Sequence, residues 1–318
     1  MRRLLFIRTD RMGDLLMSLP AIHAARVSFP DAEITLLLQK GLEPLLNTHP
    51  EIDRILCWEP GEGIGWPAVF RWVRQLRHLH LDAAVVLNPT RFFHTALFLA
   101  GIPIRVGYRR KWGFLLTRAI PDTKTSRSIH ESEYNLELVR LLGIEPGPAV
   151  LSLPQNPADE AAAQRRLEQL GLAKNSRPIA LHPWTSNPIK SWPLESFREL
   201  TNRLISKGYP VLIIGGPEVR PEMDAWKKTL GPAADGVGQI PLELLPAALK
   251  RCALLISNDS GPVHVAAGVN TPTFVAAPKE HGVLLNRWRP LGRGHRIFLS
   301  PGVEEIARAV REQVPCES

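Results

Sequence analysis

The sequence predicts an α/β protein built from two Rossmann-like halves, each with a parallel sheet, and three observations predict this fold. Short β-rich runs alternate with amphipathic segments along the chain, the order typical of parallel strands joined by crossover helices. The length of 318 residues is comfortable for two domains. Residues 145–159, EPGPAVLSLPQNPAD, contain four prolines around a short apolar piece, and the same alternation restarts after them. We therefore expect two domains, 1–153 and 154–318.

The first half opens with an expected strand at residues 3–8. Its apolar part is too short for the apolar region of a signal peptide, which spans about 7–15 residues. Residues 12–29 are expected to be helical, and Pro20 either kinks this segment or starts a helix behind a Ser18 cap. The other elements expected here are strands at 33–38 and 83–87 and a helix at 67–79.

The second half repeats this order of elements. Strands are expected at 178–182, 210–214, 253–257 and 271–276, and helices at 194–207, 221–230, 242–250, after Gly261, and at 303–314. Periodicity does not place the last helix, and crossing back onto the first domain is one arrangement open to it. In a parallel sheet, ligands bind at the carboxyl ends of the strands, so the loops that follow these strands are the candidate sites.

Cysteine spacing and apolar runs exclude several classes of protein. Cys57, Cys252 and Cys316 lie far apart and form no C-x-x-C pair, so neither a disulfide framework nor a zinc site is expected. No apolar run approaches the roughly 18 residues of a membrane-spanning helix. We expect a cytoplasmic protein.

The charge of the chain points to an anionic partner. The formal net charge is +8, and no acidic residue occurs between Asp82 and Asp122. The same interval contains six basic residues, Arg91, Arg105, Arg109, Arg110, Lys111 and Arg118. A solvated basic face is the plain interpretation of this interval, with an anionic small molecule or a phosphorylated membrane lipid as the alternatives. No nucleic-acid-binding motif is present, so we expect no nucleic-acid partner.

The stretch ISNDSGPVHVAAGV, residues 256–269, contains the most informative motif. Ser260 is not expected to be a nucleophile, because the G-x-S-x-G of a nucleophile elbow lacks its first glycine here. Gly261 and Pro262 instead suit the start of a helix whose N–H groups and dipole face a phosphate. Asp259 would repel phosphate and is better placed to accept hydrogen bonds from sugar hydroxyls. His264 either reaches the phosphates or packs in the interior.

Two further loops of the second half carry groups that suit a nucleoside diphosphate. Thr185 and Ser186, with Lys190 a few residues on, supply hydroxyls and a cation. In the pair Gly215-Gly216 the chain can pass close to a nucleotide. Glu218 then either binds ribose hydroxyls or interacts favourably with the dipole of the next helix, near whose N-terminus it stands.

Asp14 is the candidate catalytic residue of the first half. It follows Gly13 in the loop TDRMGD, near the N-terminus of a helix, a position that keeps a carboxylate ionised and ready to accept a proton. An ordinary N-cap aspartate is the alternative.

Taken together, these motifs resemble glycosyltransferase family 9, the heptosyltransferases that use ADP-heptose to build the lipopolysaccharide inner core. The resemblance rests on RTDRMGDLLMSLPAI near the start, LNPTRFFHTALFLAGIPIRVGYRRKWGFLLT in the middle, and then LHPWTSNPIKSWPLESF, IIGGPE and ISNDSGPVHVAAGVNTP. It implies a GT-B fold, two Rossmann-like domains facing a cleft, with the acceptor held by the N-terminal domain and the nucleotide sugar by the C-terminal one.

The resemblance also implies roles for individual residues. Asp14 would be the general base of an inverting transfer, and Lys190 would face the donor phosphates. The other donor-binding candidates are Thr185, Ser186, Gly216, Glu218, Asp259, Ser260, Gly261 and His264. For an acceptor that carries Kdo carboxylates and lipid A phosphates, the candidates are Gly13, Arg91, Arg109, Arg110 and Lys111. The chain contains no D-x-D motif, so neither a metal nor another cofactor is expected.

Two positions depart from the family pattern, and two other functions compete with the main prediction. Trp184 stands where a small residue is more usual and could reshape the pocket floor, and Lys279-Glu280-His281 stands where a threonine is more usual. The competing functions are transfer of another sugar or to another envelope glycan, and a nucleotide-binding scaffold without catalysis. A dehydrogenase is the weakest option, since GEGIG at 61–65 follows no clear strand and lacks the G-x-G-x-x-G spacing. A lipid-linked acceptor would bring the enzyme into peripheral contact with the cytoplasmic face of the inner membrane.

Overall fold

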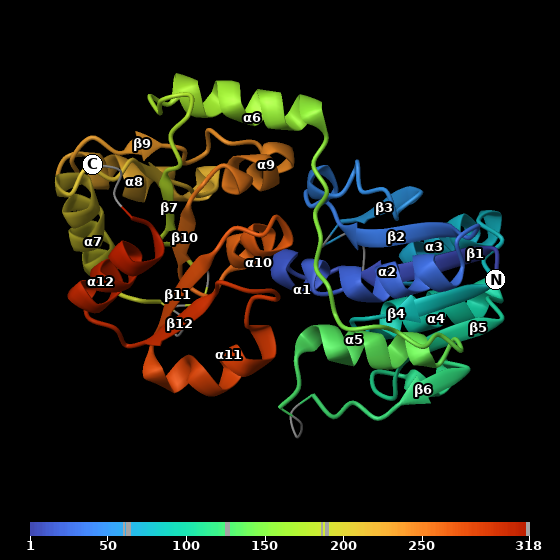
Figure 1. Ribbon diagram of the computed structural model, residues 1–318. Helices are drawn as coiled ribbons and strands as arrows, with labels where there is room; N and C mark the ends of the chain where they lie inside the picture. The colour runs from blue at the N-terminus through green and yellow to red at the C-terminus, as the bar shows by residue number, and fades with distance from the viewer. Residues whose placement is uncertain (60, 62–64, 125–127, 186, 188–190, 316–318) are drawn as a thin grey trace. The chain divides into compact units, whose positions relative to one another are not determined.

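The computed structural model describes residues 1–59, 61, 65–124, 128–185, 187 and 191–315. The chain divides into two compact units, Met1–Leu151 and Ser152–Ser318. Each unit contains one six-stranded parallel sheet with helices on both faces (Figure 1). The expected α/β fold with two Rossmann-like halves is confirmed.

The sheet of the first unit has the strand order β3-β2-β1-β4-β5-β6, the order of a Rossmann fold. The central strand β1 (Arg3–Arg8) is flanked by β2 (Glu33–Gln39) and β4 (Ala83–Val86), and its residues from Leu4 onward are buried. The remaining strands of this sheet are β3 (Arg54–Trp58), β5 (Ile104–Tyr108) and β6 (Arg118–Ile120).

Helices cover both faces of the first sheet. On one face, α3 (Trp66–His78) packs beside α4 (Arg91–Ala100), and Val69, Trp72, Val73 and Leu76 of α3 are buried at the helical spacing. On the other face, α2 (Leu19–Ser28) packs beside α5 (Glu131–Arg140). The short α1 (Met12–Leu16) precedes α2, and Pro20 stands in the first turn of α2 behind Ser18.

The sheet of the second unit has the order β12-β11-β10-β7-β8-β9, which repeats the first order when its strands are counted from β7. Its strands are β7 (Ile179–His182), β8 (Val211–Ile213), β9 (Ala234–Asp235), β10 (Leu254–Ser257), β11 (Thr273–Ala277) and β12 (Arg296–Leu299).

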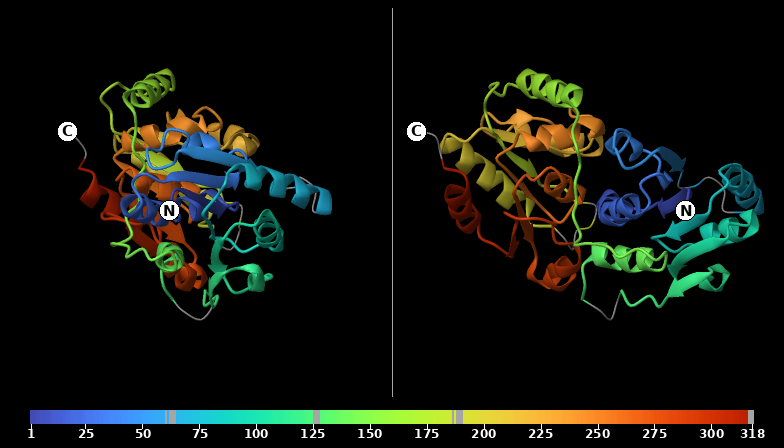
Figure 2. Two further views of the ribbon diagram at one scale, coloured as in Figure 1. Left: turned by 90° about the vertical axis from the view of Figure 1, so that its right-hand side faces the viewer. Right: turned by 45° about the vertical axis from the view of Figure 1, so that its right-hand side comes forward.

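The helices of the second unit also lie on both faces of their sheet (Figures 1 and 2). One face is covered by α7 (Leu194–Ser206), α8 (Arg220–Lys227) and α12 (Val303–Gln313), and α12 packs against α7. The other face is covered by α9 (Leu245–Lys250) and α10 (Gly261–Gly268), and α6 (Pro157–Gln169) packs against α9. The short α11 (Gly282–Trp288) follows β11.

One sequence-based statement was wrong. The segment GEGIG at 61–65 does follow a strand, because β3 ends at Trp58. This strand was missed because its five residues are at most half-buried and its side chains do not alternate clearly between apolar and polar. The segment still lacks the spacing of a dinucleotide fingerprint.

Candidate functional site

In the first unit, Arg8 organises the loop that carries Asp14. Arg8 is the last residue of β1, and its side chain is only 2% exposed. Its guanidinium donates to Asp10 at 2.7 Å, to Asp14 at 2.8 Å and to Glu131 at 3.1 Å. Burial alone would lower the pKa of Arg8, but the three carboxylates raise it above its ordinary value, so Arg8 stays charged.

The three carboxylates around Arg8 differ in exposure. Glu131 on α5 is fully buried and also accepts from Lys124 at 2.8 Å. Asp10 and Asp14 keep 33% and 22% of their side chains exposed. Burial raises the pKa of Asp10, while Arg8 opposes that shift. Asp14 lies in the first turn of α1. Its carboxylate is oriented by Arg8 and is partly exposed, so a substrate could reach it.

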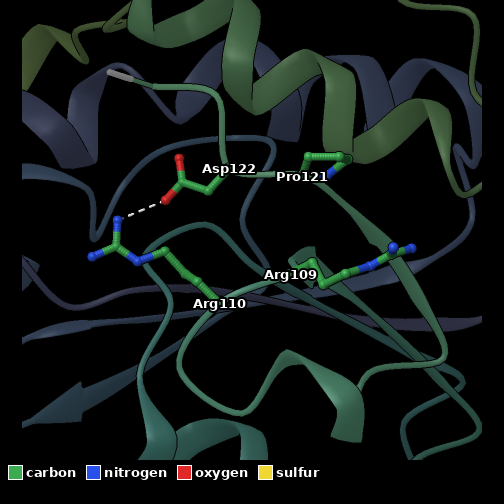
Figure 3. A pocket seen from close by; sticks show the side chains of 4 residues that line it. All are labelled: Arg109, Arg110, Pro121 and Asp122. Carbon is green, nitrogen blue, oxygen red and sulfur yellow. Dashed lines mark hydrogen bonds and ion pairs between the residues drawn. The ribbon is translucent and has the colours of Figure 1, made fainter. Parts of the chain in front are cut away.

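The basic candidates of the first unit line two hollows. Arg109, Arg110, Pro121 and Asp122 surround a cavity of about 480 Å³ (Figure 3). Arg110 turns toward Asp122 and pairs with it at 2.6 Å, whereas the guanidinium of Arg109 extends in the opposite direction. The second cavity, of about 380 Å³, is lined by Trp58, Thr90, Arg91, Phe92 and Lys111. Both hollows therefore offer cations to an anion.

In the second unit, Asn258 fixes the loop that carries the N-D-S-G-P-x-H motif. Its fully buried side chain donates to the carbonyl of Pro183 at 2.6 Å and accepts from the backbone N–H of Trp192 at 2.7 Å. One amide thus joins the end of β10 to the loop after β7 and to the approach to α7. Sequence analysis placed Asn258 in the motif without giving it this role.

Ser260 precedes α10 as its N-cap, but its hydroxyl makes no capping hydrogen bond to the helix. Its Oγ lies 3.1 Å from Nδ1 of His182 and 3.0 Å from Oγ of Ser257. Burial lowers the pKa of His182 to about 4, so the imidazole is neutral at neutral pH. Among the described residues, no carboxylate hydrogen-bonds to His182, so the arrangement is not a catalytic triad.

Asp259 forms a buried pair with His281, the last residue of the short helix η6 (Lys279–His281). Asp259 Oδ2 and His281 Nε2 are 2.9 Å apart, and the two side chains are 3% and 1% exposed. His264 is also buried, at 3% exposure, within α10. Both Asp259 and His264 are therefore buried in this structure.

The two glycines after β8 have different neighbours, and Gly215 packs against Trp184. A Cβ on Gly215 would lie 3.1 Å from the Trp184 ring, and that ring packs at a tilt against Trp226 with centroids 5.6 Å apart. Trp184 is 8% exposed and belongs to the hydrophobic core of the second unit. Glu218 is exposed in η4 (Pro217–Val219), with its carboxylate over Gly216.

The remaining donor-side candidates lie in the loop after β7. Thr185 is half-buried, and its Oγ1 accepts from the backbone N–H of Asn187 at 3.3 Å. Ser186 and Lys190 lie outside the described residues, and Gly13 is the second residue of α1.

Sequence reasoning missed Arg8, His182 and His281 as parts of the candidate sites. Arg8 and His182 are polar residues that end buried strands, and this position was the signal that could have found them. His281 carries no such signal, because its pairing with Asp259 depends on the fold.

In the part of the chain that the structure describes, no helix is both long enough and apolar enough to cross a membrane. Likewise, no group of three or more His, Cys, Asp or Glu side chains among the described residues could hold a metal ion.

The comparisons with known proteins define the class. Two Rossmann-like units of this kind form the GT-B fold. The structure of a glycosyl transferase family 9 protein from Veillonella parvula matches this chain with a TM-score of 0.82 at 19% identity, and the match covers 98% of this chain and 90% of that one. The E. coli ADP-heptose lps heptosyltransferase II has a TM-score of 0.79 at 22% identity, covering 94% and 90%. The family described as Glycosyltransferase family 9 (heptosyltransferase) matches residues 69–281. The chain belongs to this family and is a glycosyltransferase.

Curated relatives match over most of their lengths. The lipopolysaccharide heptosyltransferase 2 of Escherichia coli (strain K12) is 28% identical over 291 residues, 85% of this chain and 81% of the relative. The lipopolysaccharide heptosyltransferase 3 of Escherichia coli is 24% identical over 271 residues, 82% of this chain and 78% of the relative.

Proposed function

We propose that this glycosyltransferase transfers a heptose from ADP-L-glycero-D-manno-heptose to Kdo or heptose of the lipopolysaccharide inner core, with inversion at the anomeric carbon. The names of its relatives support the donor and acceptor classes, and an E. coli heptosyltransferase with a TM-score of 0.77 was solved with ADP. The single observation that carries the catalytic part is the Arg8–Asp14 pair, which orients a partly exposed carboxylate in the first turn of α1.

Asp14 is the general base in this proposal. It accepts the proton of an acceptor hydroxyl while that oxygen forms a bond to the anomeric carbon. On the opposite face, the bond between the anomeric carbon and the phosphate oxygen breaks, and ADP departs with the electron pair. Arg8 keeps the Asp14 carboxylate in one orientation, so the base does not have to be ordered at the moment of transfer.

The second unit binds the donor in this proposal. Negative charge grows on the departing diphosphate, and a helix N-terminus together with hydroxyls and a cation stabilises it. Because the hydroxyl of Ser260 is turned to His182 and Ser257 rather than into a cap, the N-terminus of α10 at Gly261 is left to the phosphates. Thr185, Ser186, Lys190, Gly216, Glu218, Asp259 and His264 complete the proposed donor side, with Ser186 and Lys190 assigned from the sequence.

The first unit binds the acceptor in this proposal. Arg91, Arg109, Arg110 and Lys111 line its two hollows, where cations suit the carboxylates of Kdo and the phosphates of lipid A. Gly13, which precedes Asp14 in α1, completes the proposed acceptor side. The reaction uses no metal, and the enzyme acts in the cytoplasm at the face of the inner membrane, where a water-soluble donor meets a lipid-linked acceptor.

The test measures ADP release and heptosylation with ADP-heptose and a heptose-deficient lipopolysaccharide acceptor. Asp14→Asn should bind ADP as wild type does and turn over at least roughly a hundredfold more slowly. Asp10→Asn is the matched control, because Asp10 pairs with the same guanidinium at 2.7 Å and is similarly exposed. Its turnover should fall by less than about tenfold.

Three outcomes would overturn parts of the proposal. Equal losses in the two variants would mean that the charge around Arg8 matters rather than the base. Transfer from another nucleotide sugar, with none from ADP-heptose, would mean that the donor is wrong. ADP binding without transfer of any sugar would favour a scaffold.

A further inference from the structure

Two large aromatic side chains lie exposed beside the cationic hollows of the first unit. Trp112 and Phe114, in the loop between β5 and β6, are 45% and 77% exposed, and their ring centroids are 6.4 Å apart. The guanidinium of Arg91, the first residue of α4, lies over the Trp112 ring at 5.7 Å from its centroid. We call the set Arg91, Arg109, Lys111, Trp112 and Phe114 the aromatic–basic patch.

The backbone beneath the aromatic–basic patch is held in an unusual conformation. Lys111 and Trp112 have φ values of 48° and 68°, in the left-handed region that non-glycine residues rarely adopt. The carbonyl of Lys111 is 2.9 Å from Nδ1 of the fully buried His94, which anchors the loop to α4. Gly113 packs on the Tyr108 carbonyl, where a Cβ would come within 3.0 Å. Such conformations persist only where the surrounding structure enforces them. The contacts of this loop therefore hold the Trp112 side chain in its exposed position.

The cations of the aromatic–basic patch are available to an external anion. Arg91, Arg109 and Lys111 are exposed and form no ion pair with any residue that the structure describes. Arg110, which lies outside the patch, is engaged with Asp122. No acidic residue occurs in the sequence between Asp82 and Asp122. A second copy of the chain would bring the same cations against each other, which disfavours self-association through this surface.

We propose that the aromatic–basic patch docks the enzyme on a bilayer of anionic phospholipid, with Trp112 and Phe114 inserted among the headgroups. Aromatic rings settle at the membrane–water interface, and lysine and arginine are attracted to an anionic leaflet. The two contributions together give stable peripheral binding, which either alone does not. The inference rests on the proposed function in that a lipid-linked acceptor has to be met at a bilayer.

Vesicle co-sedimentation tests this docking without any lipopolysaccharide. Wild type should bind vesicles of phosphatidylcholine and phosphatidylglycerol in a ratio of about 7:3 and should bind phosphatidylcholine alone far more weakly. The double variant Trp112→Ala/Phe114→Ala should bind the anionic vesicles at least roughly tenfold more weakly.

The chain offers a matched control for this variant. Trp66 and Phe70 on α3 are 61% and 59% exposed with ring centroids 6.1 Å apart, so Trp66→Ala/Phe70→Ala removes a similar exposed pair. Vesicle binding by this variant should stay within about twofold of wild type. An equal loss in both variants, or vesicle binding by the Trp112→Ala/Phe114→Ala protein at the wild-type level, overturns the docking surface.

Activity on two forms of the acceptor separates this inference from the proposed function. With a deacylated, water-soluble acceptor, Trp112→Ala/Phe114→Ala should turn over as wild type does, and with acceptor embedded in anionic vesicles it should be slower. A loss on the soluble acceptor as well would place the two rings in the acceptor site and overturn the docking role. A wild-type protein that binds vesicles but transfers no heptose to either acceptor would refute the proposed function and leave the docking surface standing.

Discussion

Arg8 Nη2 and Asp14 Oδ1 form an ion pair at 2.8 Å, in which the arginine is buried in the first unit and the aspartate is partly exposed. The same guanidinium also holds Asp10 and the fully buried Glu131. One charged group thus links the end of β1, the first turn of α1 and α5. The candidate base depends on a residue that itself has no access to substrate.

Replacing Arg8 by methionine should destabilise the protein strongly. The change removes the guanidinium that the buried Glu131 shares with Asp10 and Asp14, at a cost of about 3–5 kcal/mol in the free energy of unfolding. Urea denaturation measures the loss. Arg54→Met is the control, because Arg54 pairs with Glu33 at a similar distance of 2.9 Å but is 50% exposed. That exposed pair should contribute at most about 1 kcal/mol. Similar losses in both variants would contradict a special role for Arg8.

The buried strands and the loops after them could be predicted from the sequence because their apolar runs are dense. The strands β1, β2, β4, β7, β8, β10 and β11 were all anticipated within one or two residues. Five strands were not anticipated: the edge strands β3, β6, β9 and β12, and also β5. Of these, β6 and β9 have three and two residues and include a charged residue each, so they form no dense apolar run.

The hydrogen-bonded pairs within the candidate sites could not be predicted from the sequence, for a different reason. Arg8 and Glu131 are 123 residues apart, and Asp259 and His281 are 22 residues apart in separate segments. Neither separation carries a local signal, because only the strand order of each sheet brings these residues together. Asp14 itself could be identified from the sequence, because it stands at a strand–helix junction.

His281 should be replaceable by glutamine but not by alanine. Its Nε2 lies 2.9 Å from the buried carboxylate of Asp259. Alanine leaves that carboxylate without this partner, at a cost of about 2–3 kcal/mol in the free energy of unfolding. The side-chain amide of glutamine reaches the position of Nε2 and should recover most of this loss. Chemical denaturation of the two variants decides the matter, and equal destabilisation by both would mean that the shape of His281 matters rather than its hydrogen bond.

Gly268, the last residue of α10, should tolerate no side chain. A Cβ there would lie 2.8 Å from Cγ and Cδ1 of Leu153, whose backbone N–H donates to the Gly268 carbonyl at 2.8 Å. Gly268→Ala should therefore cost about 1–3 kcal/mol in the free energy of unfolding. Gly147→Ala is the control, because no atom lies within 4 Å of a Cβ at that position, and it should change stability by less than about 0.5 kcal/mol.

A double-mutant cycle identifies the clash at Gly268. In a Leu153→Ala background the contact atoms are gone, so Gly268→Ala should cost much less than it does in wild type. Additive losses would show that the helix end rejects alanine for another reason.

The burial of His182 should make stability depend on pH in a defined window. Burial lowers the pKa of His182 to about 4 from an ordinary value of 6.5. Between these values the unfolded chain binds a proton at His182 and the folded chain does not. His182 therefore contributes stability that is complete above about pH 6.5 and is lost as the pH falls toward 4.

His182→Asn removes this titration while keeping a side-chain oxygen near the position of Nδ1 to accept from Ser260. The free energy of unfolding, measured by urea denaturation between about pH 4 and pH 7, should fall less steeply with acid in the variant than in wild type. A residual slope is expected, because burial also lowers the pKa of His94 and of His295. Identical slopes in the two proteins would mean that burial does not lower the pKa of His182 in the folded state.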